Sequence, residues 1–152
     1  MTTCTTCHLT AIRREQPLCE RIYETEGWRV VHAFNTSLPG WLVVIAKRHV
    51  ESFAELTEAE AAEFGPFLHR VSRALQEVTG AVKTYTILFA EHPEHPHVHF
   101  HVVPRAADIP EENRSTRVFN YLGVPEADIV PLEARNALAE RLRAILERTP
   151  WV

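Results

Sequence analysis

The feature that most constrains the fold is residues 97–103, where histidine alternates with apolar residues. Successive side chains of a strand point to opposite faces, so His97, His99 and His101 share one face and the apolar residues share the other. The apolar face must pack against a core, whereas a row of imidazoles adds little to strand stability. Because histidine ligates metals, transfers protons near neutral pH and can act as a nucleophile, we expect this face to carry the function.

The length of 152 residues suits one domain with a substantial core, and we expect a single domain over residues 1–152. A composition of 45% hydrophobic and 24% charged residues is typical of a soluble globular protein, and a net charge of −4 argues against binding a nucleic-acid polymer. No apolar run reaches the ~18–20 residues of a membrane span, and the N-terminus does not resemble a secretory signal. We therefore expect a cytoplasmic protein that does not bind membranes.

Apolar runs bounded by turn residues predict four further strands. They cover residues 18–24, 28–34, 41–46 and 83–91, with a hairpin turn at Glu26 and Gly27 between the first two. A helix should begin at Thr57, which can form a capping box with Glu60, and end near Gly80, with a kink or a late start at Pro66.

The last third of the chain divides into two parts. Residues 106–131 contain several prolines and glycines without a clear period, and we expect an irregular, functional excursion there. Apolar residues at helical spacing then predict a C-terminal helix over 132–148. This order of strands and helices predicts an α+β fold with a mainly antiparallel sheet of five to six strands, one long central helix and a C-terminal helix.

Four segments, in the same order, resemble the histidine-triad family. The histidine strand matches the family's His-x-His-x-His pattern, and residues 38–49 resemble its Pro-Gly-His-x-Leu-Val-Ile-Pro-Lys-x-His segment. Asn35 stands where the family often has an Asn or Asp near the ribose of a nucleotide. Cys4-Thr-Thr-Cys7 resembles the opening of the family's zinc-carrying bacterial members. The resemblance covers about Cys4 to Arg105 and leaves residues 105–152 weakly anchored.

The resemblance implies a nucleotide hydrolase or transferase that acts at an α-phosphate and pairs as a homodimer. Its substrates would be dinucleoside polyphosphates or nucleoside phosphoramidates. The family's middle histidine, here His99, is the nucleophile and would form a covalent nucleotidyl-histidine. His101 is our candidate to donate a hydrogen bond to the phosphate.

Two departures from the family pattern leave alternatives open. Trp41 replaces the histidine of the Pro-Gly-His segment and is a candidate to stack on a nucleotide base. The family's Gly-Gln approach to the triad, whose Gln contacts the α-phosphate, is replaced by residues 92–96, where Pro93 has no side-chain donor. Either His95 or His92 takes over this contact, or catalysis is weak, or the substrate differs. The alternative to an enzyme is a catalytically weak or inactive nucleotide-binding dimer with a structural zinc.

The spacing of Cys4 and Cys7 is common in zinc sites. The resemblance supplies His49 and His97 as the other two ligands of a closed, structural zinc site. Cys19, the third cysteine, should be buried in a strand. The open alternatives are free thiols on a mobile N-terminus, ligation by His92 or His95, and a catalytic metal held by His95, His97, His99 and His101.

Overall fold

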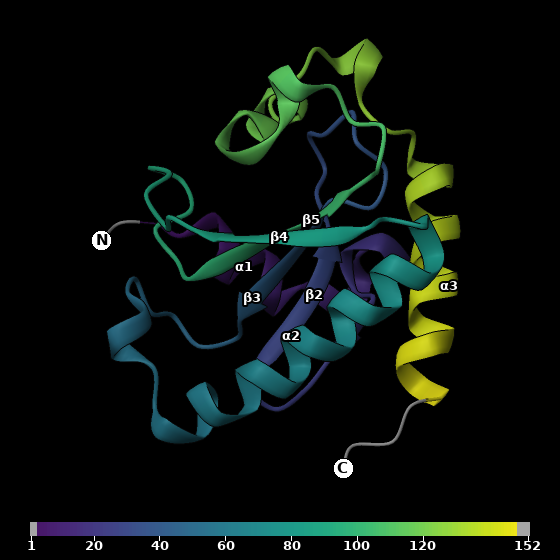
Figure 1. Ribbon diagram of the computed structural model, residues 1–152. Coiled ribbons are helices and arrows are strands. Elements are labelled where there is room, and N and C mark those ends of the chain that lie inside the picture. The colour runs from purple at the N-terminus through teal and green to yellow at the C-terminus, as the bar shows by residue number, and fades with distance from the viewer. Residues whose placement is uncertain (1–2, 149–152) are drawn as a thin grey trace.

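The computed structural model describes residues 3–148 and contains a five-stranded sheet crossed by one long helix (Figure 1). The strands are β1 (Tyr23–Glu24), β2 (Trp28–His32), β3 (Leu42–Ala46), β4 (Lys83–Leu88) and β5 (His99–Arg105). Their order across the sheet is β1-β2-β3-β5-β4, and every neighbouring pair is antiparallel. The predicted α+β fold with a mainly antiparallel sheet is confirmed.

Three α-helices accompany the sheet: α1 (Thr5–Ala11), α2 (Glu58–Thr79) and α3 (Leu132–Arg148). In Figure 1, α2 runs across one face of the sheet, and α3 lies beside the C-terminal half of α2. Short 3-10 helices cover Arg13–Glu15, Leu18–Glu20, Phe53–Glu55, Glu111–Asn113, Ser115–Tyr121 and Glu126–Asp128. No helix within residues 3–148 is both long and apolar enough to cross a membrane.

The start and end of α2 follow from its capping residues. The backbone N–H of Glu60 donates to the Thr57 hydroxyl at 3.1 Å, and the N–H of Thr57 donates to the Glu60 carboxylate at 2.8 Å. This reciprocal pair is the predicted capping box. Gly80 ends the helix in the left-handed conformation, with φ of 72°. The expected late start at Pro66 is wrong, because the helix is continuous from Glu58 through this exposed proline.

Alternate residues of the three central strands face α2 and α3 and form the main core. The intervening apolar residues of the histidine segment belong to it, as predicted: Val98, Phe100 and Val102 are buried there. They pack with residues of β2 and β3 and with α2 and α3, including Trp28, Val30, Val44, Phe67, Val71, Leu75 and Leu142. His99 and His101 therefore lie on the opposite face, where they are only partly covered.

The predicted strand over residues 18–24 is largely wrong. Only Tyr23–Glu24 pairs with β2, and the preceding Leu18–Glu20 is a 3-10 helix. Cys19 is buried as expected, but in this helix and not in a strand. Its backbone N–H donates to the side chain of Asn136 on α3 at 3.0 Å, a tertiary contact that no local pattern announces.

Four other strands differ from the prediction at their ends, and the strand over 41–46 begins at Leu42. The strand over 28–34 ends at His32, the strand over 83–91 ends at Leu88, and the histidine strand begins at His99. His97 therefore precedes β5. The regular structure in residues 106–131 consists of 3-10 helices, in keeping with the predicted irregular excursion. These residues cover a second, smaller core on the face of the sheet that carries His99 and His101. Its buried members are Ala33, Trp41, Val103, Ile109 and Val118.

His32, at the end of β2, is a fully buried histidine held neutral by its contacts. Its Nδ1–H donates to the carbonyl of Ala33 at 2.7 Å, and its Nε2 accepts the backbone N–H of Gly40 at 2.9 Å. Burial lowers the pKa of His32 to about 4. A second proton on Nε2 would also face the Gly40 N–H, so protonation costs a hydrogen bond as well as desolvation.

We expect the folded state to lose stability as the pH falls from about 6.5 to about 4. The unfolded histidine binds its proton near pH 6.5, whereas folded His32 does so only near pH 4, so the contribution of His32 is complete above pH 6.5. Denaturant titrations at several pH values give the free energy of unfolding. Between pH 6.5 and 4 this free energy should fall less steeply in His32→Gln than in the wild type, by about 1 kcal/mol per pH unit. His69→Gln, at an exposed position of α2, is the control. If the free energy of unfolding depends equally on pH in the wild type, His32→Gln and His69→Gln, this prediction is contradicted.

Candidate active site and metal centre

His99 and His101 lie side by side on β5, a strand with neighbours on both sides. In the sheet register His101 lies between Val43 of β3 and Ile87 of β4, and His99 is opposite Ile45 of β3. The two imidazole rings are 5.1 Å apart, edge to face. Both line a pocket of about 600 Å³, a size typical of small-molecule sites.

The backbone fixes the tautomer of His99. Its Nδ1 lies 2.7 Å from the carbonyl oxygen of His97. Because a carbonyl oxygen only accepts, Nδ1 must carry the hydrogen and Nε2 keeps its lone pair. Burial also lowers the pKa of His99, which favours the neutral ring. His99 thus carries an unprotonated ring nitrogen on a rigid strand that lines the pocket.

The opposite tautomer holds at His101. The indole Nε1–H of Trp41 donates to Nδ1 of His101 at 3.1 Å, so the hydrogen of the neutral ring is on Nε2. Burial lowers the pKa of His101 to about 4. Trp41 itself is fully buried and is not part of the pocket wall. The expectation that Trp41 stacks on a base is therefore wrong in this structure, and its contact is with His101.

The other two residues predicted to bind substrate, Asn35 and His95, both line the pocket. The wall also contains three aromatic residues that the sequence reasoning missed: Phe34, Phe89 and Phe119. Phe34 and Phe89 are more than half exposed, and Phe119 comes from the irregular excursion. No local pattern marks Phe119, since it reaches the pocket only through the tertiary fold.

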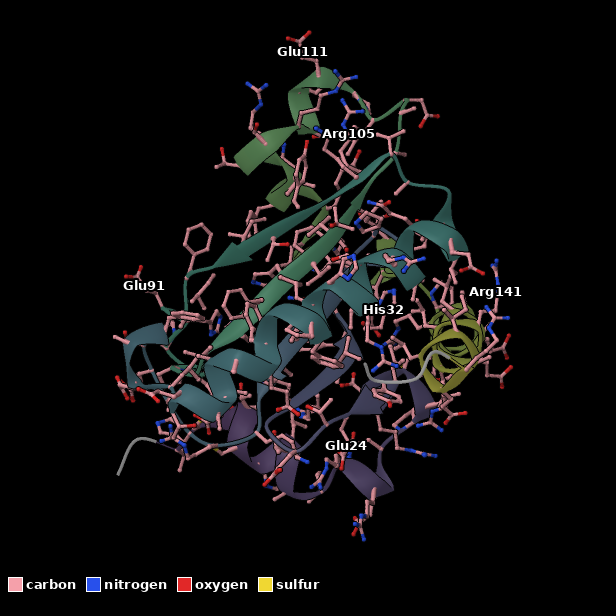
Figure 2. The ribbon with its side chains drawn as sticks, turned by 60° about the horizontal axis from the view of Figure 1, so that its bottom comes forward. Glu24, His32, Glu91, Arg105, Glu111 and Arg141 are labelled. Atoms are coloured by element: carbon pink, nitrogen blue, oxygen red, sulfur yellow. The ribbon has the colours of Figure 1, made fainter. Side chains whose placement is uncertain are left out.

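Three residues of the loop that follows β4 also line the pocket: His92, Glu94 and His95. Glu91, just before this loop, and Arg105 lie near opposite ends of the β4–β5 pair (Figure 2). The loop contacts helix α1: the N–H of Thr5 donates to the carbonyl of Glu94 at 3.0 Å, and the Thr6 hydroxyl lies 2.8 Å from Nδ1 of His95. The N-terminal helix therefore holds the segment that replaces the family's Gly-Gln.

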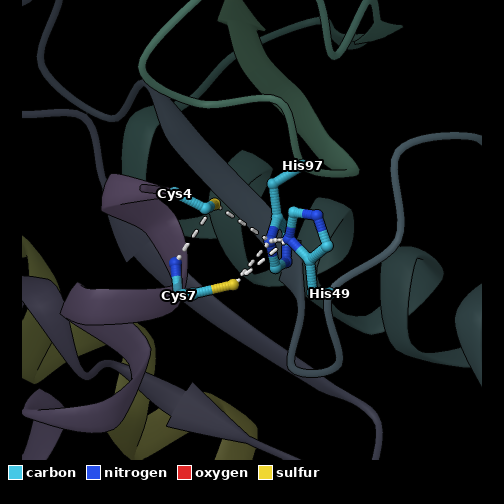
Figure 3. Close-up of side chains that lie close together, drawn as sticks. All are labelled: Cys4, Cys7, His49 and His97. Carbon is cyan, nitrogen blue, oxygen red and sulfur yellow. Dashed lines mark hydrogen bonds between the residues drawn. The ribbon is translucent and has the colours of Figure 1, made fainter. Parts of the chain in front are cut away.

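The four predicted metal ligands converge at one point (Figure 3). Nδ1 of His97 lies 3.6 Å from Sγ of Cys4, 3.5 Å from Sγ of Cys7 and 3.3 Å from Nδ1 of His49. Sγ of Cys7 is 3.2 Å from Nδ1 of His49. Cys4 and Cys7 lie at the start of α1. His49 follows β3, and His97 lies just before β5.

These distances can be compared with a tetrahedral zinc site. Zn–S bonds of ~2.3 Å and Zn–N bonds of ~2.0 Å separate a sulfur from a nitrogen ligand by ~3.5 Å, and two nitrogens by ~3.3 Å. The sulfur–nitrogen distances of 3.2–3.6 Å and the nitrogen–nitrogen distance of 3.3 Å fit this tetrahedron. Two thiols and two imidazoles are also a donor set that suits zinc. The cluster can therefore hold a metal ion.

Contacts behind the ligands orient the two imidazoles. Nε2–H of His97 donates to the carbonyl of Ala46 at 2.6 Å, and Nε2 of His49 lies 3.2 Å from the carboxylate of Glu51. In both rings this leaves the Nδ1 lone pair directed to the cluster, as a metal ligand requires. Sγ of Cys4 accepts the backbone N–H of Cys7 at 3.4 Å and so also caps α1.

The described part of the chain has one further group of potential ligands, His92, Glu94 and His95. Neither it nor the cysteine cluster includes His99 or His101. Nδ1 of His92 accepts the backbone N–H of Glu94 at 3.2 Å. The geometry thus gives no support to a catalytic metal held by the histidine strand.

The sheet, the histidine-lined pocket and the cysteine–histidine cluster define an α+β protein of the histidine-triad class. The chain matches the HIT domain family over residues 13–108, which is more than half of its length, and it belongs to that family. No curated protein matches the chain. The predicted family is confirmed, and the match ends close to Arg105, where the resemblance in the sequence also ends.

Solved structures with similar folds agree with this assignment. A zinc-bound histidine triad family protein from Mycobacterium smegmatis is 21% identical, with a TM-score of 0.67 over 95% of this chain and 94% of that one. A hypothetical histidine triad nucleotide-binding protein from Sulfolobus tokodaii is 21% identical, with a TM-score of 0.70 over 95% and 92%. A HIT-like protein from Bartonella henselae is 22% identical, with a TM-score of 0.67 over 91% and 93%. At these identities the likeness shows the fold.

We expect the purified protein to contain one zinc ion per chain, bound by the four-residue cluster. Coordination contributes to folding free energy, so a chelator should lower the melting temperature and expose residues before Leu18 to proteolysis. Elemental analysis should find zinc strongly reduced in Cys7→Ser and His49→Ala, and His97→Ala should lose both zinc and stability. His8→Ala, which changes an exposed histidine on α1, is the matched control. A wild-type protein without metal and indifferent to chelator would contradict this prediction.

Proposed function

We propose that the protein is a nucleotide hydrolase or transferase that acts at an α-phosphate, with His99 as the nucleophile. The observation that carries this proposal is the hydrogen bond from Nδ1 of His99 to the His97 carbonyl, which leaves Nε2 with a free lone pair in the pocket. Catalysis by a rigidly placed nucleophile needs little reorganisation, and placement of this kind contributes several kcal/mol to rate enhancement.

The proposed reaction has two displacements. Nε2 of His99 forms a bond to the α-phosphorus while the bond from phosphorus to the leaving group breaks, and the leaving group departs with the electron pair. Water or another nucleophile then forms a bond to the phosphorus while the P–N bond breaks and its electron pair returns to Nε2 of His99. An attacking water passes one proton to the solvent. Nε2–H of His101 is suited to donate to a non-bridging oxygen, where negative charge builds up.

The other pocket residues fit the binding of a nucleotide. We propose that Asn35 contacts the ribose and that the exposed rings of Phe34 and Phe89 offer apolar surface to a base. Pro93 has no donor in place of the family's Gln. His95 is the better replacement, because the Thr6 hydroxyl anchors its Nδ1 and leaves Nε2 for the phosphate.

The cysteine–histidine cluster is proposed as a structural zinc site. Its four protein ligands complete a tetrahedron and leave no open position for substrate. The metal would fasten α1 to the end of β3 and to the start of the histidine strand. Zinc would thus contribute to stability and to the shape of the pocket and not to the chemical step.

We expect His99→Asn to abolish turnover while fold and zinc content remain unchanged. Asparagine has no nitrogen that can attack phosphorus, so hydrolysis of a diadenosine polyphosphate or an adenosine phosphoramidate should fall by about a thousandfold or more. His101→Ala should lower the rate and weaken binding. His69→Asn, on the outer surface of α2, is the control.

The outcomes separate the two candidate functions. If the wild type turns over and His99→Asn keeps comparable activity, the nucleophile lies elsewhere. If neither protein is active but nucleoside monophosphates bind, the alternative reading as a catalytically weak or inactive nucleotide-binding module is correct.

We further propose that the protein forms a homodimer through β4 and α2. β4 is an outer strand of the sheet and has β5 as its only partner in the described chain, so its other edge is free to pair with a second copy. Light scattering at micromolar concentration should give twice the chain mass of 17.4 kDa. A mass of one chain at that concentration would exclude this arrangement.

A further inference from the structure

Trp41, at which this chain departs from the family sequence, contacts His101, one of the two histidines in the pocket. Trp41 occupies the position of the histidine in the family's Pro-Gly-His segment. Its ring is fully buried and meets His101 edge-on, with ring centroids 5.6 Å apart and an interplanar angle of 82°. The 3.1 Å hydrogen bond between them runs from the indole N–H to Nδ1 of His101.

An indole can only donate a hydrogen bond, whereas an imidazole at the same place can donate or accept. Opposite Trp41, Nδ1 of His101 must therefore be the acceptor in every state that keeps the contact. An imidazolium at His101 would carry a hydrogen on Nδ1 that faces the indole N–H. The substitution thus favours the neutral ring of His101 and its Nε2–H tautomer.

The surroundings of His101 offer no replacement partner for Nδ1. Phe119 packs edge-on against both rings, with centroids 5.4 Å from Trp41 and 5.2 Å from His101. The cross-strand neighbours Val43 and Ile87 are apolar. Among residues 3–148, Trp41 is the hydrogen-bond partner of this ring, and the titratable group beside it is His99.

We propose that Trp41 is a positioning residue that holds His101 as a neutral hydrogen-bond donor and thereby restricts the enzyme to substrates whose leaving group departs without a proton. This inference rests on the proposed function. A neutral imidazole can donate a hydrogen bond to phosphate oxygen, but giving up its proton would leave an imidazolate. His101 is therefore a poor general acid in this site.

The restriction selects between the two substrate classes of the family. When a phosphoanhydride P–O bond breaks, the departing phosphate takes the electron pair as a stable anion. When a phosphoramidate P–N bond breaks, the departing amine must take up a proton, since an amide anion is too basic to leave. The preferred substrates are therefore phosphoanhydrides, such as dinucleoside polyphosphates.

The tautomer can be read directly in the substrate-free protein by 15N NMR of histidine-labelled samples, with His101 assigned from the signals lost in His101→Asn. In the wild type we expect an unprotonated Nδ1 and a protonated Nε2. In Trp41→Phe, which keeps an aromatic ring without the N–H, a mixture of tautomers should appear. A wild-type His101 with its hydrogen on Nδ1 would overturn the inference, whether or not the variant folds.

The substrate preference is measured as the ratio of kcat/KM for diadenosine triphosphate to that for adenosine 5′-phosphoramidate. Trp41→His restores an imidazole that can share a proton with His101, and it should shift the ratio toward the phosphoramidate by about tenfold or more. Trp28→Phe is the matched control, because it removes another buried indole hydrogen bond, to the Glu60 carbonyl at 2.9 Å, on the other face of the sheet. It should leave the ratio and the His101 tautomer unchanged.

Failure of this inference is distinct from failure of the proposed function. An active wild type whose ratio is unchanged in Trp41→His overturns the restriction and leaves His99 as the nucleophile. A wild type that turns over neither substrate refutes the proposed function and with it the substrate restriction. The NMR signals of His101 then decide whether Trp41 positions the ring.

Discussion

The contacts of the buried His97 hold together the cysteine–histidine cluster and the start of the histidine strand. Its Nε2–H donates to the carbonyl of Ala46 at the end of β3, and its Nδ1 faces the sulfurs of Cys4 and Cys7. Its own carbonyl accepts Nδ1–H of His99 and so sets the tautomer of that ring. A shift of this one residue would disturb the ligand geometry and the free lone pair of His99 together.

The parts of the fold that the sequence predicts correctly are those decided by local periodicity and capping. Alternation alone places Val98 and Phe100 in the core and His99 on the other face. The capping box at Thr57 is likewise a matter of residues three positions apart. The complete set of four metal ligands does not follow from local patterns, because His49 lies 42 residues from Cys7 in the sequence. Only the family resemblance supplied it.

The errors arise where tertiary contacts override local preference. Residues 18–24 have the composition of a strand, yet the hydrogen bond from the Cys19 N–H to Asn136 on α3 and the 3-10 helix over Leu18–Glu20 decide their conformation. Trp41 suggested a stacking surface, but its indole N–H donates to His101, which lies 60 residues away in the sequence. Phe119 belongs to an excursion without a period, and its place against the histidines depends on the packing of the second core.

The metal cluster and the pocket are physically connected through α1. A helix of seven residues is not stable alone in water, so its position depends on what fastens it to the sheet. Cys4 and Cys7 fasten its first turn to the cluster, while Thr6, between them, contacts His95 in the pocket wall. Loss of a bound metal would therefore release the helix and the loop that it supports. Under the proposed function, a metal ion held by this cluster would therefore also determine where His95, the proposed phosphate contact, lies.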